Sequence, residues 1–177
     1  MNLIDIKSPA DLKGLSISEL TDLTAQARQA LMTKVSEHGG HFGPPMGVAE
    51  MIMALHYVFN SPVDKIVYDV SHQSYVHKMV TGRALAFLDH DHYDDVTGYT
   101  DPTESEHDFF NIGHTSTSIS LASGLATARN LKGNSENIIA IIGDGSLSGG
   151  EAFEGLDYAA TLDSNMIIIV NDNNQSI

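Results

Sequence analysis

The stretch Ile138-Ile139-Ala140-Ile141-Ile142-Gly143-Asp144-Gly145 decides the fold of this chain. An uninterrupted apolar run that ends in Gly-Asp-Gly is typical of a buried strand that delivers one carboxylate to a tight turn. A second apolar run, residues 166–170, leads into Asn171-Asp172-Asn173. The two runs therefore predict two buried strands that carry polar side chains at their carboxyl ends.

Residues 150–162 lie between these strands and carry apolar side chains at helical spacing, which predicts a βαβ unit with two adjacent parallel strands. The carboxyl ends of parallel strands open at the same edge of a sheet, where ligands gather. Asp144 and Asn173 could therefore supply oxygen atoms to one hard cation, for which Mg²⁺ is the natural candidate.

The remaining pattern indicates an α/β fold, with a mostly parallel sheet flanked by helices, in a single domain over residues 1–177. A capping box at Ser16 opens a helix over residues 17–35. Residues 45–59 predict a second, largely apolar helix and residues 64–70 a strand, whereas residues 82–110 lack a clear period. Three strands are few for helices this apolar, so we expect the sheet to be incomplete.

Composition excludes several function classes. Nine basic residues face 23 acidic ones, and the net charge of −14 disfavours nucleic acid and anionic membranes as partners. The chain contains no cysteine and begins without a signal sequence or a long apolar span. We therefore expect a cytoplasmic protein.

Two histidines are candidates for chemistry. His41 lies in a loop rich in glycine and proline, and His72 follows the strand predicted over residues 64–70. His56, within the apolar helix, is interpreted as structural. The block Asp89-His90-Asp91-His92 could suggest a metal site, but it lacks the framework of converging elements and is interpreted as a solvated loop.

The segment Gly113-His114-Thr115-Ser116-Thr117-Ser118 opens a helix that continues to residue 131. Small hydroxylic residues there can cap the helix or leave backbone N–H groups for an anion. A dinucleotide fingerprint that begins at Gly143 fails at Ser148, and no Gly-Lys-Ser/Thr phosphate loop occurs. A cofactor that carries a diphosphate and Mg²⁺ remains.

Gly143-Asp144-Gly145 followed by Asn171-Asp172-Asn173 resembles the magnesium and diphosphate motif of thiamine-diphosphate enzymes. With Gly39-Gly40-His41, His72-Gln73 and Gly113-His114, the sequence looks like the N-terminal part of the 1-deoxy-D-xylulose-5-phosphate synthase family. The resemblance covers nearly the whole chain. It implies a thiamine-diphosphate-binding fold and a transferase of the transketolase-like group, in isoprenoid and thiamine precursor synthesis.

The resemblance also implies roles for individual residues. His41 would be catalytic, near the reacting carbonyl. Asp144, Asn173 and the Gln175 backbone carbonyl would hold Mg²⁺. The residues that line the cofactor would be His72, Gly113, His114, Thr115, Gly145, Ser146 and Asn173.

The implied reaction decarboxylates pyruvate and joins the two-carbon fragment to glyceraldehyde 3-phosphate, usually in a homodimer. Ser71 stands where the synthase pattern has glycine, and Phe42-Gly43-Pro44-Pro45-Met46-Gly47 looks closer to transketolase. Transketolase-type ketol transfer and a non-catalytic cofactor-binding module therefore stay as alternatives. The family carries its cofactor-activating glutamate on a second, pyrimidine-binding domain. We therefore expect residues 1–177 to be an N-terminal part, or one subunit of a split enzyme, and to be inactive alone.

Overall fold

The computed structural model describes residues 1–172 of the 177-residue chain. These residues form two compact units. Unit 1 comprises Met1–Asn60, His72–Gly98 and Thr103–Ser105, and unit 2 comprises Ser61–Ser71, Tyr99–Pro102 and the residues from Glu106 onward. The prediction of a single domain over the whole chain stays a prediction.

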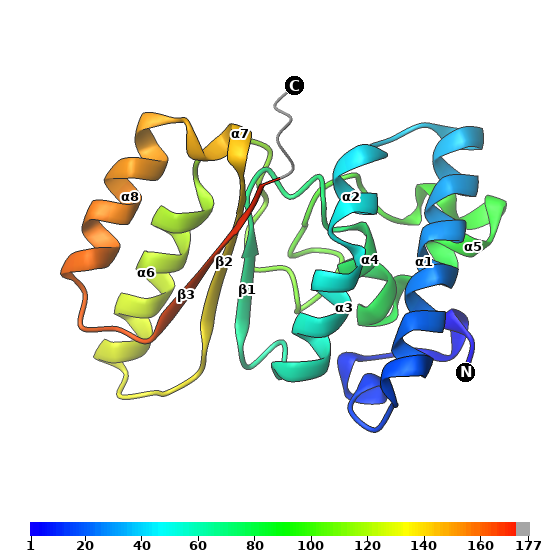
Figure 1. Cartoon of the computed structure of the whole chain (residues 1–177), viewed down its shortest axis with the longest axis horizontal. Coiled ribbons are helices and arrows are strands. Elements are labelled where there is room, and N and C mark those ends of the chain that lie inside the picture. The colour runs from blue at the N-terminus through cyan, green and yellow to red at the C-terminus, as the bar shows by residue number, and fades with distance from the viewer. Residues whose placement is uncertain (173–177) are drawn as a thin grey trace. The chain divides into compact units, whose positions relative to one another are not determined.

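Unit 2 is the α/β part of the chain, as predicted. Its parallel sheet has the order β1-β2-β3, formed by β1 (Lys65–Tyr68), β2 (Ile138–Gly143) and β3 (Met166–Asn171). The helices are α6 (Ser118–Leu131), α7 (Asp144–Leu147) and α8 (Gly150–Thr161). Figure 1 shows α6 and α8 beside the sheet, and α6 contacts all three strands.

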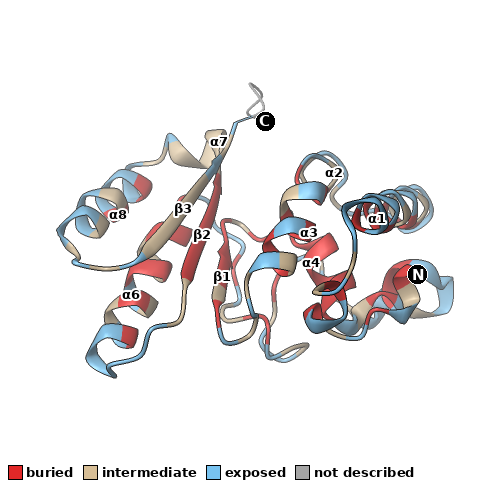
Figure 2. Ribbon diagram, turned by 60° about the horizontal axis from the view of Figure 1, so that its bottom comes forward, coloured by how far each residue is buried: buried red, intermediate tan, exposed pale blue. Residues whose placement is uncertain are grey.

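The sequence explains how α6 packs on the sheet. Apolar side chains at helical spacing, Ile119, Ala122 and Ala126, form one core with alternate residues of β2. Figure 2 shows β2 buried along its length. Helix α8 lies close to α6, as a Cβ added at Gly155 of α8 would be only 2.9 Å from Ser120 Oγ of α6. Glycine at this position therefore permits the close contact between the two helices.

Unit 1 is helical. Its elements are η1 (Leu3–Asp5), η2 (Pro9–Leu12), α1 (Ile17–His38), α2 (Gly43–Gly47), α3 (Ala49–Val58), α4 (Tyr75–Lys78), η3 (Met79–Arg83), α5 (Leu85–Leu88) and η4 (His90–Asp95). The predicted capping box is present, since Ser16 Oγ accepts from Glu19 N and Glu19 accepts from Ser16 N. Among residues 1–172, no helix is both long and apolar enough to cross a membrane.

Three local predictions need correction. The helix predicted over residues 45–59 is divided into α2 and α3 at Val48, directly after Gly47, a residue that weakens helices. β1 is shorter than residues 64–70, because Val70 and Ser71 have φ of 57° and 68°, outside the extended region. Residues 90–95, expected as a loop, form the 3₁₀ helix η4, which Asp89 caps and in which Tyr93 is buried.

Candidate functional site

The predicted carboxylate lies where the sequence indicated. β2 ends at Gly143, and Asp144 follows it as the first residue of α7 with a partly exposed side chain. In the parallel register Gly143 pairs with Asn171, so β2 and β3 end side by side at the same edge of the sheet. The geometry that the two motifs require, two strand ends beside each other, is therefore present in unit 2.

A buried carboxylate fixes the loop that carries Gly113, His114 and Thr115. Asp69, which follows β1 and is 1% exposed, accepts hydrogen bonds from Ser116 N and Ser118 N, each at 2.9 Å. These donors belong to the end of the loop and to the first residue of α6. Asp69 thereby ties the end of β1 to the segment that, from the sequence, could cap the helix or bind an anion, and this segment is exposed over residues 113–115.

The same loop is joined to the turn after β2. Ser116 Oγ donates to Ser146 O at 2.7 Å, and a Cβ added at Gly149 would lie 2.0 Å from Ser116 Oγ. Ser116 itself has a positive φ of 71°. The predicted cofactor residues Gly145 and Ser146 are thus held next to the loop of Gly113–Thr115, in one site of unit 2.

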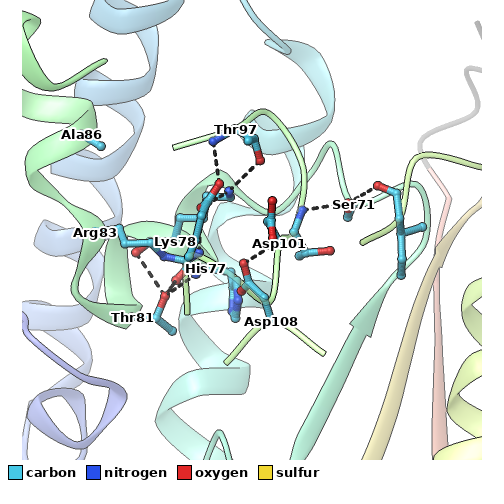
Figure 3. A network of polar contacts seen from close by, with 12 residues as sticks. Ser71, His77, Lys78, Thr81, Arg83, Ala86, Thr97, Asp101 and Asp108 are labelled. Carbon is cyan, nitrogen blue, oxygen red and sulfur yellow. Dashed lines mark hydrogen bonds and ion pairs between the residues drawn. The ribbon is translucent and has the colours of Figure 1, made fainter. Parts of the chain in front are cut away.

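Ser71 supports the start of this loop. Its side chain, labelled in Figure 3, donates to Ile112 O at 2.9 Å and accepts from Thr100 N at 3.0 Å. Ser71 has a positive φ of 68°, a backbone conformation that glycine adopts without strain. In this chain the two hydrogen bonds of the fully buried hydroxyl offset the strained backbone.

A pocket opens beside the loop. It has a volume of about 310 Å³ and is lined by Asn111, Ile112, Gly113 and His114 together with residues of α6 and Glu151. The pocket therefore includes two of the residues predicted to line the cofactor.

His41 and His72 lie together in unit 1. Their rings are in edge-to-face contact with centroids 5.3 Å apart. Tyr75 orients the His41 loop, because its Oη accepts from His41 N at 3.2 Å and lies 3.4 Å from His41 Nδ1. Gly40, with φ of 122°, permits this arrangement, since a Cβ there would lie 2.8 Å from Tyr75 Oη.

Burial lowers the pKa of His41, so its imidazole is neutral at neutral pH and can accept a proton. His56, by contrast, is fully buried, and its Nε2 lies 2.8 Å from Nδ1 of the equally buried His77. The structural role expected for His56 is consistent with this position in the helical core.

The predicted site residues thus fall into two groups. Unit 1 holds His41 and His72, and unit 2 holds Gly113, His114, Thr115, Asp144, Gly145 and Ser146. Asn173 and Gln175 lie outside the described residues.

One residue of the predicted Mg²⁺ site lies among the described residues. Asp144 offers carboxylate oxygens at the strand edge, and such oxygens are ligands that Mg²⁺ prefers. Within residues 1–172, no three histidine or acidic side chains converge on a metal position. Asp144 is therefore the one described member of the predicted ligand set.

Sequence reasoning missed the residues that hold the site together. Asp69 follows the apolar residues Ile66-Val67-Tyr68 in the same way that Asp144 follows β2, so the sequence does contain a signal for its position at a strand end. Ser116 and Tyr75 gave no such signal, because their roles depend on contacts with residues distant in the chain.

Comparison with known proteins agrees with these observations. The sequence matches the family model described as 1-deoxy-D-xylulose-5-phosphate synthase over residues 3–177. It is 51% identical over 175 residues to the 1-deoxy-D-xylulose-5-phosphate synthase of Caldanaerobacter subterraneus subsp. tengcongensis and 50% identical over 177 residues to that of Shouchella clausii. It is 49% identical over 175 residues to the synthase of Chlorobaculum tepidum.

These alignments include 99–100% of this chain and 28% of the length of each of the three relatives. The match extends over both units and over every motif on which the resemblance was based. The chain belongs to the 1-deoxy-D-xylulose-5-phosphate synthase family.

Proposed function

We propose that these residues form the diphosphate- and Mg²⁺-binding part of a thiamine-diphosphate-dependent transferase. In the proposed reaction the whole enzyme decarboxylates pyruvate and joins the two-carbon fragment to glyceraldehyde 3-phosphate, which yields 1-deoxy-D-xylulose 5-phosphate. The activity, substrates and partners are proposed for the whole enzyme, because the chain spans 28% of the length of its relatives.

One observation carries the proposal. The hydrogen bond from Ser116 Oγ to Ser146 O joins the Gly113–Thr115 loop to the Gly-Asp-Gly turn, and Asp69 fixes this loop to β1. Backbone groups of a polar loop and a carboxylate at the same sheet edge are the groups that a diphosphate with its Mg²⁺ needs. A turn formed only to connect β2 with α8 would not require the link to the other loop.

The residues have distinct proposed roles. Asp144, Asn173 and the Gln175 carbonyl hold Mg²⁺. The residues that line the cofactor are His72, Gly113, His114, Thr115, Gly145, Ser146 and Asn173. The cofactor supplies the nucleophilic carbon and the electron sink of the reaction. His41, neutral at neutral pH and oriented by Tyr75, exchanges a proton with the oxygen of the substrate's carbonyl group.

The matches to synthases support this function over transketolase-type ketol transfer, which was suggested by the loop of residues 44–47. Assay of the whole enzyme separates the candidates. Release of carbon dioxide from pyruvate with formation of 1-deoxy-D-xylulose 5-phosphate is expected. Ketol transfer between sugar phosphates without carbon dioxide would indicate transketolase, and cofactor binding without turnover of either kind would indicate a non-catalytic module.

The metal assignment has a separate test. Asp144→Ala is expected to weaken Mg²⁺-dependent binding of thiamine diphosphate by more than about tenfold, since even outer-shell partners of a metal contribute that much. Titration calorimetry with and without Mg²⁺ measures the effect. Asp157→Ala, at an exposed position of α8, is the matched control. Equal affinities for the two variants would refute the role of Asp144.

Four further features belong to the proposal. The enzyme is a homodimer, acts in the cytoplasm, needs the pyrimidine-binding domain in cis or in trans, and is inactive as residues 1–177 alone. Purified residues 1–177 are expected to show no carboligation with cofactor, Mg²⁺ and both substrates. Robust turnover in that assay would contradict the requirement for a second domain.

A further inference from the structure

A pocket in unit 1 contains His41 and a buried lysine. It has a volume of about 220 Å³, and its walls are residues 38–41, Tyr75, residues 96–98, Tyr93 and Lys34. The volume suits a small molecule or its charged end, since one water molecule occupies about 30 Å³ in the liquid.

Lys34 is held firmly in place. It is 5% exposed, and its Nζ donates to Ala86 O at 2.8 Å and to Tyr93 O at 2.7 Å. The ammonium also lies 4.5 Å from the centroid of the Phe87 ring. Two carbonyl groups and an aromatic face thus fix the amine of Lys34 at the wall of the pocket.

The charge of Lys34 has no ion-pair partner among residues 1–172, where no carboxylate oxygen lies within 4.0 Å of its Nζ. The other buried lysine of the unit, Lys78, differs in this respect, because its Nζ lies 2.5 Å from Glu104 Oε2. Arg83 Nη1 donates to the same carboxylate at 3.0 Å, and Figure 3 labels Lys78 and Arg83 side by side in this network. Lys78 is therefore neutralised by a carboxylate of the described residues, and Lys34 is not.

Burial, followed by the nearby Lys78, lowers the pKa of Lys34 to about 8, against smaller opposing effects of Asp94, Glu104 and Asp95. The amine is therefore mostly charged at neutral pH. An ammonium group has three N–H donors, and the two carbonyl groups account for two of them. Its Nζ makes no further hydrogen bond within residues 1–172, so the third donor can serve a ligand in the pocket that Lys34 lines.

We propose that this pocket binds the oxyanion of a substrate, a carboxylate or a phosphate, with Lys34 as the charged donor. A bound anion would provide the counter-charge that residues 1–172 do not supply, and the interaction is strong in a desolvated site. The inference rests on the proposed function, because the same pocket holds His41 and both proposed substrates carry such a group. Lys34 would then help to select anionic substrates and to orient them toward His41.

The test measures binding and not turnover. The protein is labelled with ¹³C at lysine Cε and titrated with inorganic phosphate and, separately, with pyruvate, without cofactor. We expect a saturable shift of the Lys34 signal with at least one of the two anions. Phosphate alone would indicate the phosphate end of the acceptor substrate, and pyruvate alone would indicate the carboxylate of the donor.

Variants identify the donor. Lys34→Met is expected to weaken binding of that anion by about tenfold or more, since it removes a hydrogen bond from a charged group. Lys34→Arg, which keeps the charge, should retain more of the affinity. Lys132→Met, at an exposed position of unit 2, should leave the affinity unchanged.

Two results would overturn the proposal. One is the absence of a saturable Lys34 shift in the wild-type protein with either anion, which decides the question even if Lys34→Met does not fold. The other is a folded Lys34→Met variant with wild-type affinity. Because the assay does not depend on carboligation, failure of the synthase reaction can be distinguished from failure of the anion site.

Discussion

The most direct test of the site geometry is Asp69→Asn. Asp69 is 1% exposed, and its two carboxylate oxygens accept from Ser116 N and Ser118 N, each at 2.9 Å. Asparagine has nearly the same shape but offers one acceptor oxygen and one NH₂ group. The substitution therefore leaves the packing intact and makes one of the two backbone N–H groups face a donor.

The cost follows from these contacts. A hydrogen bond to a charged group contributes about 1.5–3 kcal/mol net, and a buried donor left without an acceptor costs about 1–3 kcal/mol. Asparagine loses one such bond, weakens the other and leaves one N–H group unsatisfied. We expect the free energy that holds the loop of residues 113–117 closed to fall by about 2–4 kcal/mol.

Amide hydrogen exchange measures this locally. A loss of this size should speed exchange at Ser116 and Ser118 by about 30-fold to 10³-fold. Asp64→Asn is the matched control, because Asp64 is also a buried carboxylate of unit 2, beside the start of β1, and accepts from Asn137 N at 2.7 Å and Asn137 Nδ2 at 2.9 Å. Both variants should lower global stability, but Asp69→Asn alone should weaken binding of thiamine diphosphate.

Exchange rates at Ser116 and Ser118 within about threefold of wild type would refute the reasoning, since that corresponds to well under 1 kcal/mol. Equal loss of cofactor affinity in Asp64→Asn and Asp69→Asn would also refute it. In that case general destabilisation, and not the position of the loop, would govern cofactor binding.

Three further predictions follow from single contacts. Gly149→Ala should lower the urea midpoint by the equivalent of about 1–3 kcal/mol or more, because the new Cβ would lie 2.8 Å from Ser116 Cβ. Adding Ser116→Gly should restore stability, because it removes that Cβ at a position where φ is 71°. Glu104→Gln should cost about 3–5 kcal/mol in thermal unfolding, because it removes the charge opposite the fully buried Lys78; a loss below 1 kcal/mol would contradict this. Burial lowers the pKa of Lys34 from 10.5 to about 8, so between pH 8 and pH 10.5 the unfolded state binds more protons than the folded state. The free energy of unfolding should therefore rise with pH by up to about 3 kcal/mol, an increase that Lys34→Met must lack.

The local sequence predicted the parts of this protein whose structure depends on hydrophobic periodicity. The runs before Gly143 and before Asn171 became β2 and β3 in parallel register, and the helix between them spans Gly150–Thr161. Capping chemistry likewise predicted the start of α1 at Ser16. Period and caps act over a few residues, so they can be recognised without knowledge of distant contacts.

The strand predicted over residues 64–70 ends early, at Tyr68, just before two residues with strained backbone. Nothing in the residues around Val70 and Ser71 indicates positive φ, which a β-branched residue avoids unless its surroundings impose it. The imposing contacts come from Ile112 O and Thr100 N, both far along the chain. The early end of β1, which leads to His72, is therefore a tertiary effect.

The sequence by itself determined that a carboxylate lies at the strand edge, since Asp144 directly follows the apolar run that forms β2. Tertiary structure alone decided which distant groups pair. In unit 2, Asp69 accepts from Ser116 and Ser118, and Ser116 donates to Ser146. In unit 1, Lys34 donates to two carbonyl groups of residues more than fifty positions away. The physical reason is that a hydrogen bond between distant residues depends on how the elements pack, and neither partner carries a local pattern that identifies the other.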